Sequence, residues 1–559
     1  MKKLLGIFAV SALTILGCTT AFASNSVQGD ADSDGILTAK DSAYVLQKTL
    51  DSTFKVPMAA EEYSVYCDVN GDKVVNADDA SLILQRVLND SVKFAPIGGS
   101  TETTTETTTA TTTETTTVTT TETTTQVTTE GTTEETTIPD GFNTVPENFD
   151  YTVNVSNFSE LKSALSDCAK KSGQKAIYIT DDINATEQIK LATSNANISL
   201  IGVEKADGSY PAIDFAKFRD SKNSTGENGT GIYVSKGSYY NFKNLIVKNA
   251  PDCGMRIKNS NSGNCIVQNC VFKYNNNSGI SVTAGGHDNT FIGVDSYRNC
   301  DLVQKLGSDA DGFSVKLNAG KNNKFFACRA WENGDDGWDS FDKTTSGYTK
   351  DLSYEECACW NNGNPDIFTG KYDYENGNAL DTNLYLVELI SKQDKNFVSN
   401  YNKGNFSLPT DSFINTSAGK INLSSWTGSN YDGNPNGFKF GSAYTDKTSL
   451  RTVKNCLSFG HGRKGFDNNN STVKASFENC VSFDNGYNYY FPTFSVSKAS
   501  DMLGFNGKSK DKVPSSVSVT TPTDSAQKSI RSKVEATRKS IVSQCNNNVI
   551  PGEVYFNIY

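Results

Sequence analysis

The chain has 559 residues, which is too many for one ordinary domain. Its formal net charge of −11 argues against a nucleic-acid partner, because nucleic acids require a basic surface. The same charge does not exclude an acidic polymer as substrate, provided that a cation lies between protein and polymer.

The first residues have the order of a secretory signal. Met1-Lys2-Lys3 is basic, the run from Leu4 to Leu16 is apolar, and Ala21-Phe22-Ala23 offers small residues for cleavage. We therefore expect a signal peptide over residues 1–23 and a secreted, extracellular protein. Ile15-Leu16-Gly17-Cys18 offers an alternative, a lipid anchor at Cys18. No other apolar run approaches the ~20 residues of a membrane helix, so we expect no membrane partner.

Residues 25–95 contain two similar loops, which begin at Asp30 and Asp68. Each has oxygen-bearing side chains at positions 1, 3, 5, 9 and 12 and runs into an apolar, helix-like segment. This spacing is how a 12-residue loop wraps calcium. The expected ligands are Asp30, Asp32, Asp34, Thr38 and Asp41, then Asp68, Asn70, Asp72, Asn76 and Asp79. Position 6 usually needs glycine, and Lys73 in the second loop is expected to strain that turn.

The duplicated loop, with Asp rather than Glu at position 12, resembles a type I dockerin. The resemblance covers the whole of residues 25–95 and implies a small α-helical calcium-binding module. It also implies a partner, a cohesin of a scaffoldin, and an enzyme associated with a cellulosome.

Residues 99–139 are almost entirely Thr and Glu. They have no apolar periodicity and cannot bury a core. We expect a disordered, glycosylated linker that tethers two modules.

Residues 147–559 are expected to form a second domain, built from repeats. The repeated unit is glycine, apolar, variable, apolar, and it begins at Gly254, Gly279, Gly312, Gly337, Gly437 and Gly465. Short strands that recur about every 25 residues are typical of a parallel β-helix. The expected fold class is therefore all-β, a right-handed parallel β-helix. The long gap after Gly337 predicts an excursion within 363–430 that walls a binding cleft.

Alternation along each strand fixes which side chains face the interior. The residue after each glycine should point inward: Met255, Ile280, Phe313, Trp338, Phe438 and Phe466. The next residue should point outward, so that one column contains Arg256, Ser281, Ser314, Asp339, Lys439 and Asp467. Regularly placed cysteines (Cys265, Cys270, Cys300, Cys328, Cys357, Cys456 and Cys480) are expected to stack in the core, with disulfides as the alternative. Helices are predicted near 158–165 and 526–534.

An acidic segment, residues 333–342, lies in the middle of this repeat. Asp311 precedes Asp335 by 24 residues, about one coil, so Asp311, Asp335, Asp336 and Asp339 should lie close together. Clustered carboxylates repel one another unless a cation lies among them, and oxygen ligands without His or Cys favour calcium. The alternative is a solvated acidic turn.

Three segments of this domain resemble polysaccharide lyase family 9, the parallel β-helix pectate lyases: Asp-Gly-Phe at 311–313, Asn-Gly-Asp-Asp-Gly-Trp-Asp at 333–339 and Asn-Gly-Phe-Lys at 436–439. The resemblance implies calcium-assisted β-elimination of polygalacturonate or pectin, an acidic plant cell-wall polysaccharide. It implies Asp311, Asp335, Asp336 and Asp339 as calcium ligands and Lys439 as the base. Calcium and partial desolvation are expected to lower the pKa of Lys439.

Further basic residues are candidates for binding substrate carboxylates: Lys316, Arg451, Arg463 and Lys464. The alternative for each of them is a solvated surface charge. His287 and His461 are single and far apart in sequence, so both are expected to be structural.

Three other functions stay open at this point. A hydrolase on a similar β-helix would need two carboxyl groups across the scissile bond and no calcium. A non-catalytic pectin-binding module would use Lys439 only as a charge contact. A lyase on rhamnogalacturonan I or another uronate glycan would keep the reaction and change the polymer. Endo and exo cleavage are both compatible with the sequence.

Overall fold

The computed structural model divides into two compact units, within residues 1–129 and 130–559. In the first unit it describes residues 28–31, 37–50, 54–56, 58, 60–71, 73–88 and 92–94. In the second it describes residues 138–558 except 222–225, 304, 346–349, 410–412 and 427–430. The expected signal peptide, with Cys18, and residues 99–137 of the expected linker lie outside the described residues and stay predictions. None of the described helices combines the length and apolarity of a membrane span.

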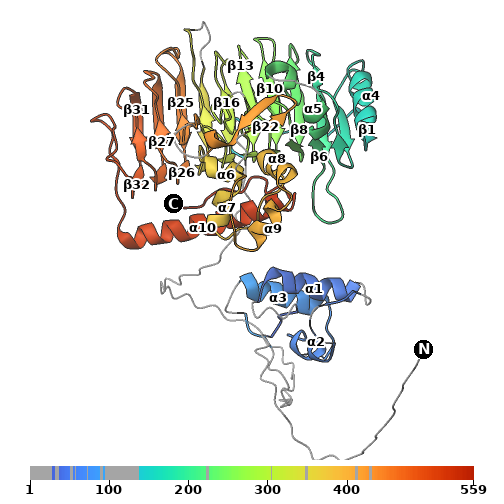
Figure 1. Cartoon of the computed structure of the whole chain (residues 1–559). Helices are drawn as coiled ribbons and strands as arrows, with labels where there is room; N and C mark the ends of the chain where they lie inside the picture. The colour runs from blue at the N-terminus through green and yellow to red at the C-terminus, as the bar shows by residue number, and fades with distance from the viewer. Residues whose placement is uncertain are drawn as a thin grey trace, which may run out of the picture. The chain divides into compact units, whose positions relative to one another are not determined.

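The first unit contains three described helices (Figure 1): α1 (Ala39–Leu50), α2 (Ala60–Tyr66) and α3 (Ala77–Leu88). α1 and α3 pack against each other around Val45 and Ile83, and each follows one of the two loops. A helix therefore follows each of the two similar loops, as the sequence predicts.

The second loop of this unit is held by its own acidic side chains. The Asp79 carboxylate accepts hydrogen bonds from the backbone nitrogens of Val69 and Asn76, both at 2.9 Å. Lys73 has a φ of 73°, which is the left-handed conformation that favours glycine, as expected from its place in the loop. Of the ten expected ligands, Asp32, Asp34 and Asp72 lie outside the described residues. Calcium and cohesin binding stay predictions.

The second unit is a parallel β-helix of three sheets, as the repeats predict (Figure 1). Sheet I has 11 strands: β1 (Tyr151–Val155), β2 (Lys175–Ile179), β5 (Ile198–Gly202), β8 (Tyr240–Lys243), β11 (Ile266–Gln268), β14 (Thr290–Ile292), β17 (Asn323–Phe326), β20 (Leu352–Glu355), β25 (Leu450–Lys454), β28 (Lys474–Glu478) and β31 (Ser495–Ser500). Sheet II has nine: β4 (Ile189–Leu191), β7 (Ile232–Ser235), β10 (Met255–Lys258), β13 (Ile280–Thr283), β16 (Phe313–Val315), β19 (Trp338–Asp339), β24 (Asn436–Lys439), β27 (Lys464–Asp467) and β30 (Tyr487–Tyr490). Sheet III has ten: β3 (Ile183–Asn184), β6 (Ala212–Asp214), β9 (Ile246–Lys248), β12 (Val271–Lys273), β15 (Asp295–Tyr297), β18 (Arg329–Trp331), β21 (Ala358–Trp360), β26 (Leu457–Phe459), β29 (Val481–Phe483) and β32 (Leu503–Phe505).

α4 (Phe158–Cys168) and α10 (Asp524–Asn546) pack on the β-helix at its first coil and along one of its sheets. α4 packs against β1 and β2, and the Asn157 side chain caps it by accepting from Glu160 N at 3.1 Å. α10 lies along sheet III, where Ile530, Val534 and Ile541 join its outer aromatic residues in one apolar cluster. Both predicted helices are confirmed. Two shorter helical segments follow β6: α5 (Ala216–Ser221) and η1 (Gly226–Gly229).

The excursion from the β-helix is present between β21 and β24 (Figure 1). It contains α6 (Pro365–Thr369), α7 (Lys371–Glu375), α8 (Tyr385–Gln393), α9 (Phe397–Asn402), the antiparallel hairpin β22 (Phe413–Thr416) and β23 (Gly419–Asn422), and η2 (Leu423–Trp426). Its apolar core is continuous with Tyr274, Cys300 and Leu302, so the insertion packs on the turns that follow β12 and β15.

Aromatic side chains stack through the interior of the β-helix. Ring centroids lie 4.7 Å apart for Phe313 and Trp338, 4.6 Å for Trp338 and Phe438, and 5.0 Å for Phe438 and Phe466. These side chains are buried, as the alternation predicts, and each contributes about 1.5–3 kcal/mol of burial free energy. The twelve cysteines that the structure describes are buried and free, which confirms core stacking over disulfides.

A second internal column is made of side-chain amides. Asn275, Asn299, Asn333 and Asn362 are linked from coil to coil by hydrogen bonds of 2.8–3.0 Å. His461 takes the next position: its Nδ1 accepts from Asn362 N at 3.3 Å and its backbone nitrogen donates to Asn485 Oδ1 at 2.9 Å. Burial lowers the pKa of His461 to about 3. The ring is thus a structural part of the column, as predicted. His287 contacts Asp288 and the Ser260 carbonyl.

Candidate active site

The outward column of sheet II has the register that the repeat predicts. Parallel pairing places Ser314 beside Asp339, Asp339 beside Lys439 and Lys439 beside Asp467. Asp339 and Lys439 are 100 residues apart in the chain but lie on neighbouring coils, about 4.8 Å from strand to strand. The excursion is therefore inserted between two adjacent rungs of this column.

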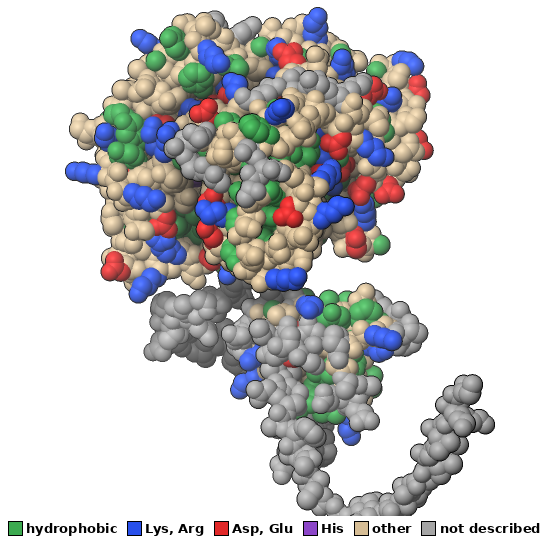
Figure 2. Space-filling view, in the orientation of Figure 1, with side chains coloured by type: hydrophobic (Ala, Val, Ile, Leu, Met, Phe, Trp, Pro, Cys, Tyr) green, Lys and Arg blue, Asp and Glu red, His purple; other side chains and the backbone are tan. Residues whose placement is uncertain are grey.

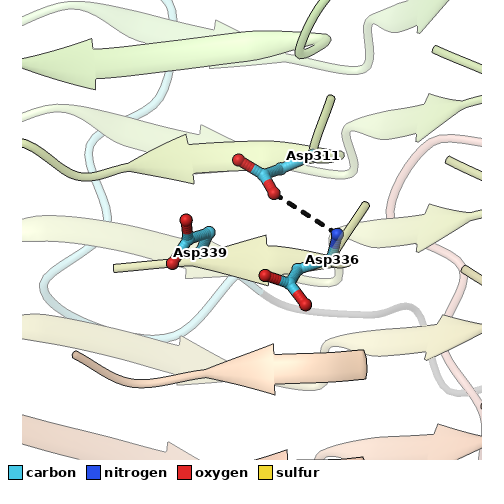
Figure 3. Close-up of side chains that lie close together, drawn as sticks. All are labelled: Asp311, Asp336 and Asp339. Atoms are coloured by element: carbon cyan, nitrogen blue, oxygen red, sulfur yellow. Dashed lines mark hydrogen bonds between the residues drawn. The ribbon is translucent and has the colours of Figure 1, made fainter. Parts of the chain in front are cut away.

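Carboxylates from two consecutive coils converge on the column (Figure 3). One oxygen each of Asp311, Asp336 and Asp339 lies within 4.8 Å of the others, and all three side chains are buried. Asp311 precedes β16 and accepts a 3.3 Å hydrogen bond from Asp336 N, drawn in Figure 3. Asp335 lies beside them and accepts from Asp309 N at 3.0 Å. All four predicted aspartates are thus brought together.

Two lysines lie against these carboxylates. Lys439 Nζ is 2.9 Å from Asp336 Oδ2 and 3.4 Å from Asp339 Oδ1. Lys316 Nζ is 2.7 Å from Asp311 Oδ2, 3.2 Å from Asp339 Oδ2 and 3.5 Å from Asp309 Oδ1.

Sequence reasoning missed two members of this cluster. Asp309 stands two residues before Asp311, and Asn436 Nδ2 donates to Asp336 Oδ1 at 2.8 Å. With Asp309, five carboxylates face the two ammonium groups of Lys316 and Lys439. The Ser308-Asp309-Ala310-Asp311 spacing was the available signal for Asp309.

Burial controls the electrostatics of the cluster. It raises the pKa of Asp311 to about 8, although Lys316 acts in the opposite direction, and it also raises the pKa of Asp335 and Asp336. Burial opposes ionisation of Asp339 too, but Lys439 and Lys316 outweigh it and hold the pKa of Asp339 below its usual value.

The pKa of Lys439 is shifted in the direction opposite to the expectation. Burial lowers it, but Asp336, Asp339, Asp335 and Asp311 together raise it well above 10.5. The reason is that the carboxylates contact the ammonium group directly.

The donor set fits a divalent, oxygen-seeking cation. Asp311, Asp336 and Asp339 each direct an oxygen to one small volume, and the carboxylates of the cluster outnumber its ammonium groups. Calcium binds carboxylate oxygens in variable geometry and would neutralise this excess negative charge. The residues present therefore fit calcium, with Asp335 adjoining the three.

A groove of about 750 Å³ passes over the cluster. It runs from Asp309, Asp335, Asp339 and Lys439 to residues of the next two coils, among them Arg463 and Lys464. The excursion was expected to wall this cleft, but no described residue of 363–430 lines it. The part of this connection that does line the groove is the segment leading into β24, through Asn434 and Asn436.

Two of the basic residues that were predicted to bind substrate carboxylates line the groove. Arg463 is exposed in the groove and donates to Asn434 Oδ1 at 2.7 Å, so it stays a candidate. Lys464 also lines the groove and is paired with Asp467 at 2.8 Å.

The prediction for Arg451 is wrong. Its side chain has no solvent exposure, because it points to the interior from β25 and donates to the Phe440 carbonyl at 2.9 Å. The prediction for Lys316 needs correction as well, since its buried ammonium is held by Asp311, Asp339 and Asp309 rather than free for substrate.

The surface carries charges of both signs. Figure 2 shows lysine and arginine side chains interspersed with acidic ones over the face of the second unit that it draws. The net charge of −11 therefore does not produce a uniformly acidic surface.

Comparison with known proteins finds similarity to several pectate lyases. Pectate lyase L of Dickeya chrysanthemi is 29% identical over 261 residues, which are 47% of this chain and 45% of the relative. Pectate lyase L of Paenibacillus polymyxa is 27% identical over 253 residues, 42% of this chain and 54% of the relative. The chain spans about half the length of these curated relatives. The crystal structure of pectate lyase Pel9A superposes with a TM-score of 0.46 at 24% identity, covering 68% of this chain and 80% of that one.

A family model described as "Pel9A-like, right handed beta helix region" matches residues 147–381. The matched range includes the four candidate aspartates and Lys316, whereas Lys439 lies beyond it. The handedness in that description agrees with the predicted fold. Residues 147–381 of this chain are therefore similar to the Pel9A-like, right-handed β-helix region.

Proposed function

We propose that the β-helix is a calcium-dependent polysaccharide lyase that cleaves pectate by β-elimination, with Lys439 as the base. The observation that carries the proposal is the position of Lys439 Nζ, 2.9 Å from Asp336 in a groove above three converging carboxylates. A cation site and an amine in one groove are the two groups that this elimination needs. The names of the relatives, all pectate lyases, support pectate as the substrate.

The reaction removes a proton from a carbon next to a carboxylate. Calcium held by Asp311, Asp336 and Asp339 would neutralise the uronate carboxylate and stabilise the negative charge that develops beside it. Lys439 Nζ, in its neutral amine form, takes the C5 proton, and the C5–H electron pair becomes the C4=C5 double bond. The C4–O bond breaks and the leaving oxygen is protonated from solvent. Arg463 lines the same groove and would bind a neighbouring uronate carboxylate.

The position of Lys439 also implies competition within the cluster. The Asp336 and Asp339 oxygens that now contact its ammonium are members of the proposed calcium site. A cation bound there would take over these oxygens and leave the amine directed to the groove. Calcium dependence of activity is the expected consequence.

Ultraviolet absorbance of digests tests this proposal against its rivals. Polygalacturonate, methyl-esterified pectin and rhamnogalacturonan I are each incubated with the full chain, with calcium or with excess chelator. We expect unsaturated product from polygalacturonate only when calcium is present. Release of reducing ends without absorbance would indicate a hydrolase. Binding without cleavage would indicate a non-catalytic module, and absorbance only with rhamnogalacturonan I would change the polymer.

We also propose that residues 25–95 are a dockerin that attaches the secreted enzyme to a scaffoldin. Support comes from the helices α1 and α3 after the two loops and from the Asp79 carboxylate that closes the second loop. Capture of the full chain on an immobilised type I cohesin should require calcium. Equal capture in excess chelator would refute the dockerin proposal.

A further inference from the structure

The outward column of sheet II does not end at the candidate base. Parallel pairing continues it from Lys439 to Asp467 and Tyr490, and an isolated bridge adds Lys512 as the next rung. At about 4.8 Å per coil, Tyr490 lies roughly 10 Å and Lys512 roughly 14 Å from Lys439 along the helix axis. The groove above the acidic cluster extends over this part of the column and includes Tyr487, Tyr490 and Lys508.

Aromatic and basic side chains interleave at this end of the groove. The rings of Tyr487 and Tyr490 are 5.0 Å apart and nearly perpendicular. Lys464 Nζ lies 4.3 Å from the Tyr490 ring centroid, and Lys512 Nζ lies 5.2 Å from the same centroid. These cation–π contacts keep the two lysines close to the Tyr490 ring.

The charge of this end is positive. Asp467 is buried and paired with Lys464 at 2.8 Å, and Asp511 accepts from the backbone nitrogens of Asn488 and Tyr489 at 2.9 and 3.0 Å. Within the described part of the chain, Lys508 and Lys512 are exposed and have no ion pair. Their ammonium groups are available to an anionic ligand.

We propose that Tyr490, with Lys508 and Lys512, forms a subsite for the uronate units that lie beyond the one over Lys439. The inference rests on the proposed function, since it assigns a polymer of uronates to the same groove. A polyuronate has one carboxylate per residue and an apolar face on each pyranose ring. Tyr490 would stack on such a face, while Lys508 and Lys512 would bind the carboxylates on either side. The subsite makes affinity depend on the length of the substrate.

Calorimetric titration with oligomers of two lengths tests the subsite apart from turnover. The Lys439→Ala protein, in calcium buffer, is titrated with trigalacturonate and with hexagalacturonate. In that background, Tyr490→Ala should weaken hexagalacturonate binding about tenfold, the loss expected for one aromatic stacking contact. Trigalacturonate binding should change less than about twofold, which also reports that the variant is folded. Tyr490→Phe should bind like the parent, because the ring face and not the hydroxyl is used.

Two further variants complete the test. Lys512→Ala should weaken hexagalacturonate binding and reduce its dependence on salt. Tyr239→Ala is the matched control: this exposed tyrosine lies five coils from Lys439 and should leave both affinities unchanged. Parent-like hexagalacturonate binding by both Tyr490→Ala and Lys512→Ala would overturn the subsite and leave the proposed function intact. If the Lys439→Ala protein binds neither oligomer and the wild type releases no unsaturated product, both are overturned.

Discussion

His461 interrupts the asparagine column, and this position should make the β-helix sensitive to acid. Burial lowers the pKa of His461 to about 3, against an ordinary value of ~6.5. Between these values the unfolded chain binds a proton that the folded chain does not bind. Stability therefore falls as the pH falls through this window. A pH of 5 is about 1.5 units below the pKa of histidine in the unfolded chain, so the free energy of unfolding falls by roughly 2 kcal/mol.

His461→Asn removes this proton linkage and restores the residue type found at Asn333 and Asn362. Its amide oxygen can accept from Asn362 N, as His461 Nδ1 does at 3.3 Å. Any effect of the substitution on packing is independent of pH. From pH 8 to pH 5, the difference in free energy of unfolding between variant and wild type should therefore shift by about 2 kcal/mol in favour of the variant.

Urea unfolding of the full chain, followed by tryptophan fluorescence, measures this difference. All four tryptophans, Trp331, Trp338, Trp360 and Trp426, belong to the second unit, so the signal reports the β-helix and its insertion. His287→Asn is the control: it removes the other histidine and should retain the acid loss that depends on His461. Parallel pH profiles for the wild type and His461→Asn would refute the reasoning.

Three other predictions concern the core and the cluster. Asp336→Asn should lower both the calcium affinity, measured by calorimetric titration, and the activity, whereas Asp446→Asn, at a partly exposed position outside the cluster, should change neither. Trp338→Ala opens a cavity between Phe313 and Phe438 and should cost about 3–5 kcal/mol in the same urea assay; a cost below ~1 kcal/mol would contradict the stacking account. Arg451→Met should lower the melting temperature with KM for polygalacturonate unchanged, because the side chain is buried; an increase in KM at unchanged stability would return it to the substrate groove.

The periodic part of the fold was predictable because a glycine recurs at the start of each repeated unit. Glycine before an inward aromatic residue gave the strand register, and the register brought Asp339 beside Lys439 across the excursion. The aspartates at 311 and 335 followed from their separation by one coil. These conclusions need only strand alternation and the spacing of coils.

The parts that could not be predicted depend on individual deviations from the repeat. Arg451 occupies an inward position where the pattern expects an apolar residue, and only the structure shows that its guanidinium donates a hydrogen bond to the Phe440 carbonyl. Lys316 follows the end of β16, and its pairing with Asp311, Asp339 and Asp309 depends on side-chain contacts that the repeat does not describe. The asparagine column and His461 stand in the turns between sheets III and II, outside the glycine-apolar pattern. The excursion has its own core, which no repeat describes.

The most direct test of the account is the activity of Lys439→Ala on polygalacturonate in calcium buffer, read as unsaturated product by ultraviolet absorbance. We expect no product above background, with hexagalacturonate binding close to that of the wild type. Calcium binding should be at least as strong as in the wild type, because the ammonium that contacts Asp336 and Asp339 is removed. Lys439→Arg should also be inactive, because its guanidinium remains protonated. Product formation by Lys439→Ala at a rate near the wild-type rate would contradict the assignment of Lys439 as the base.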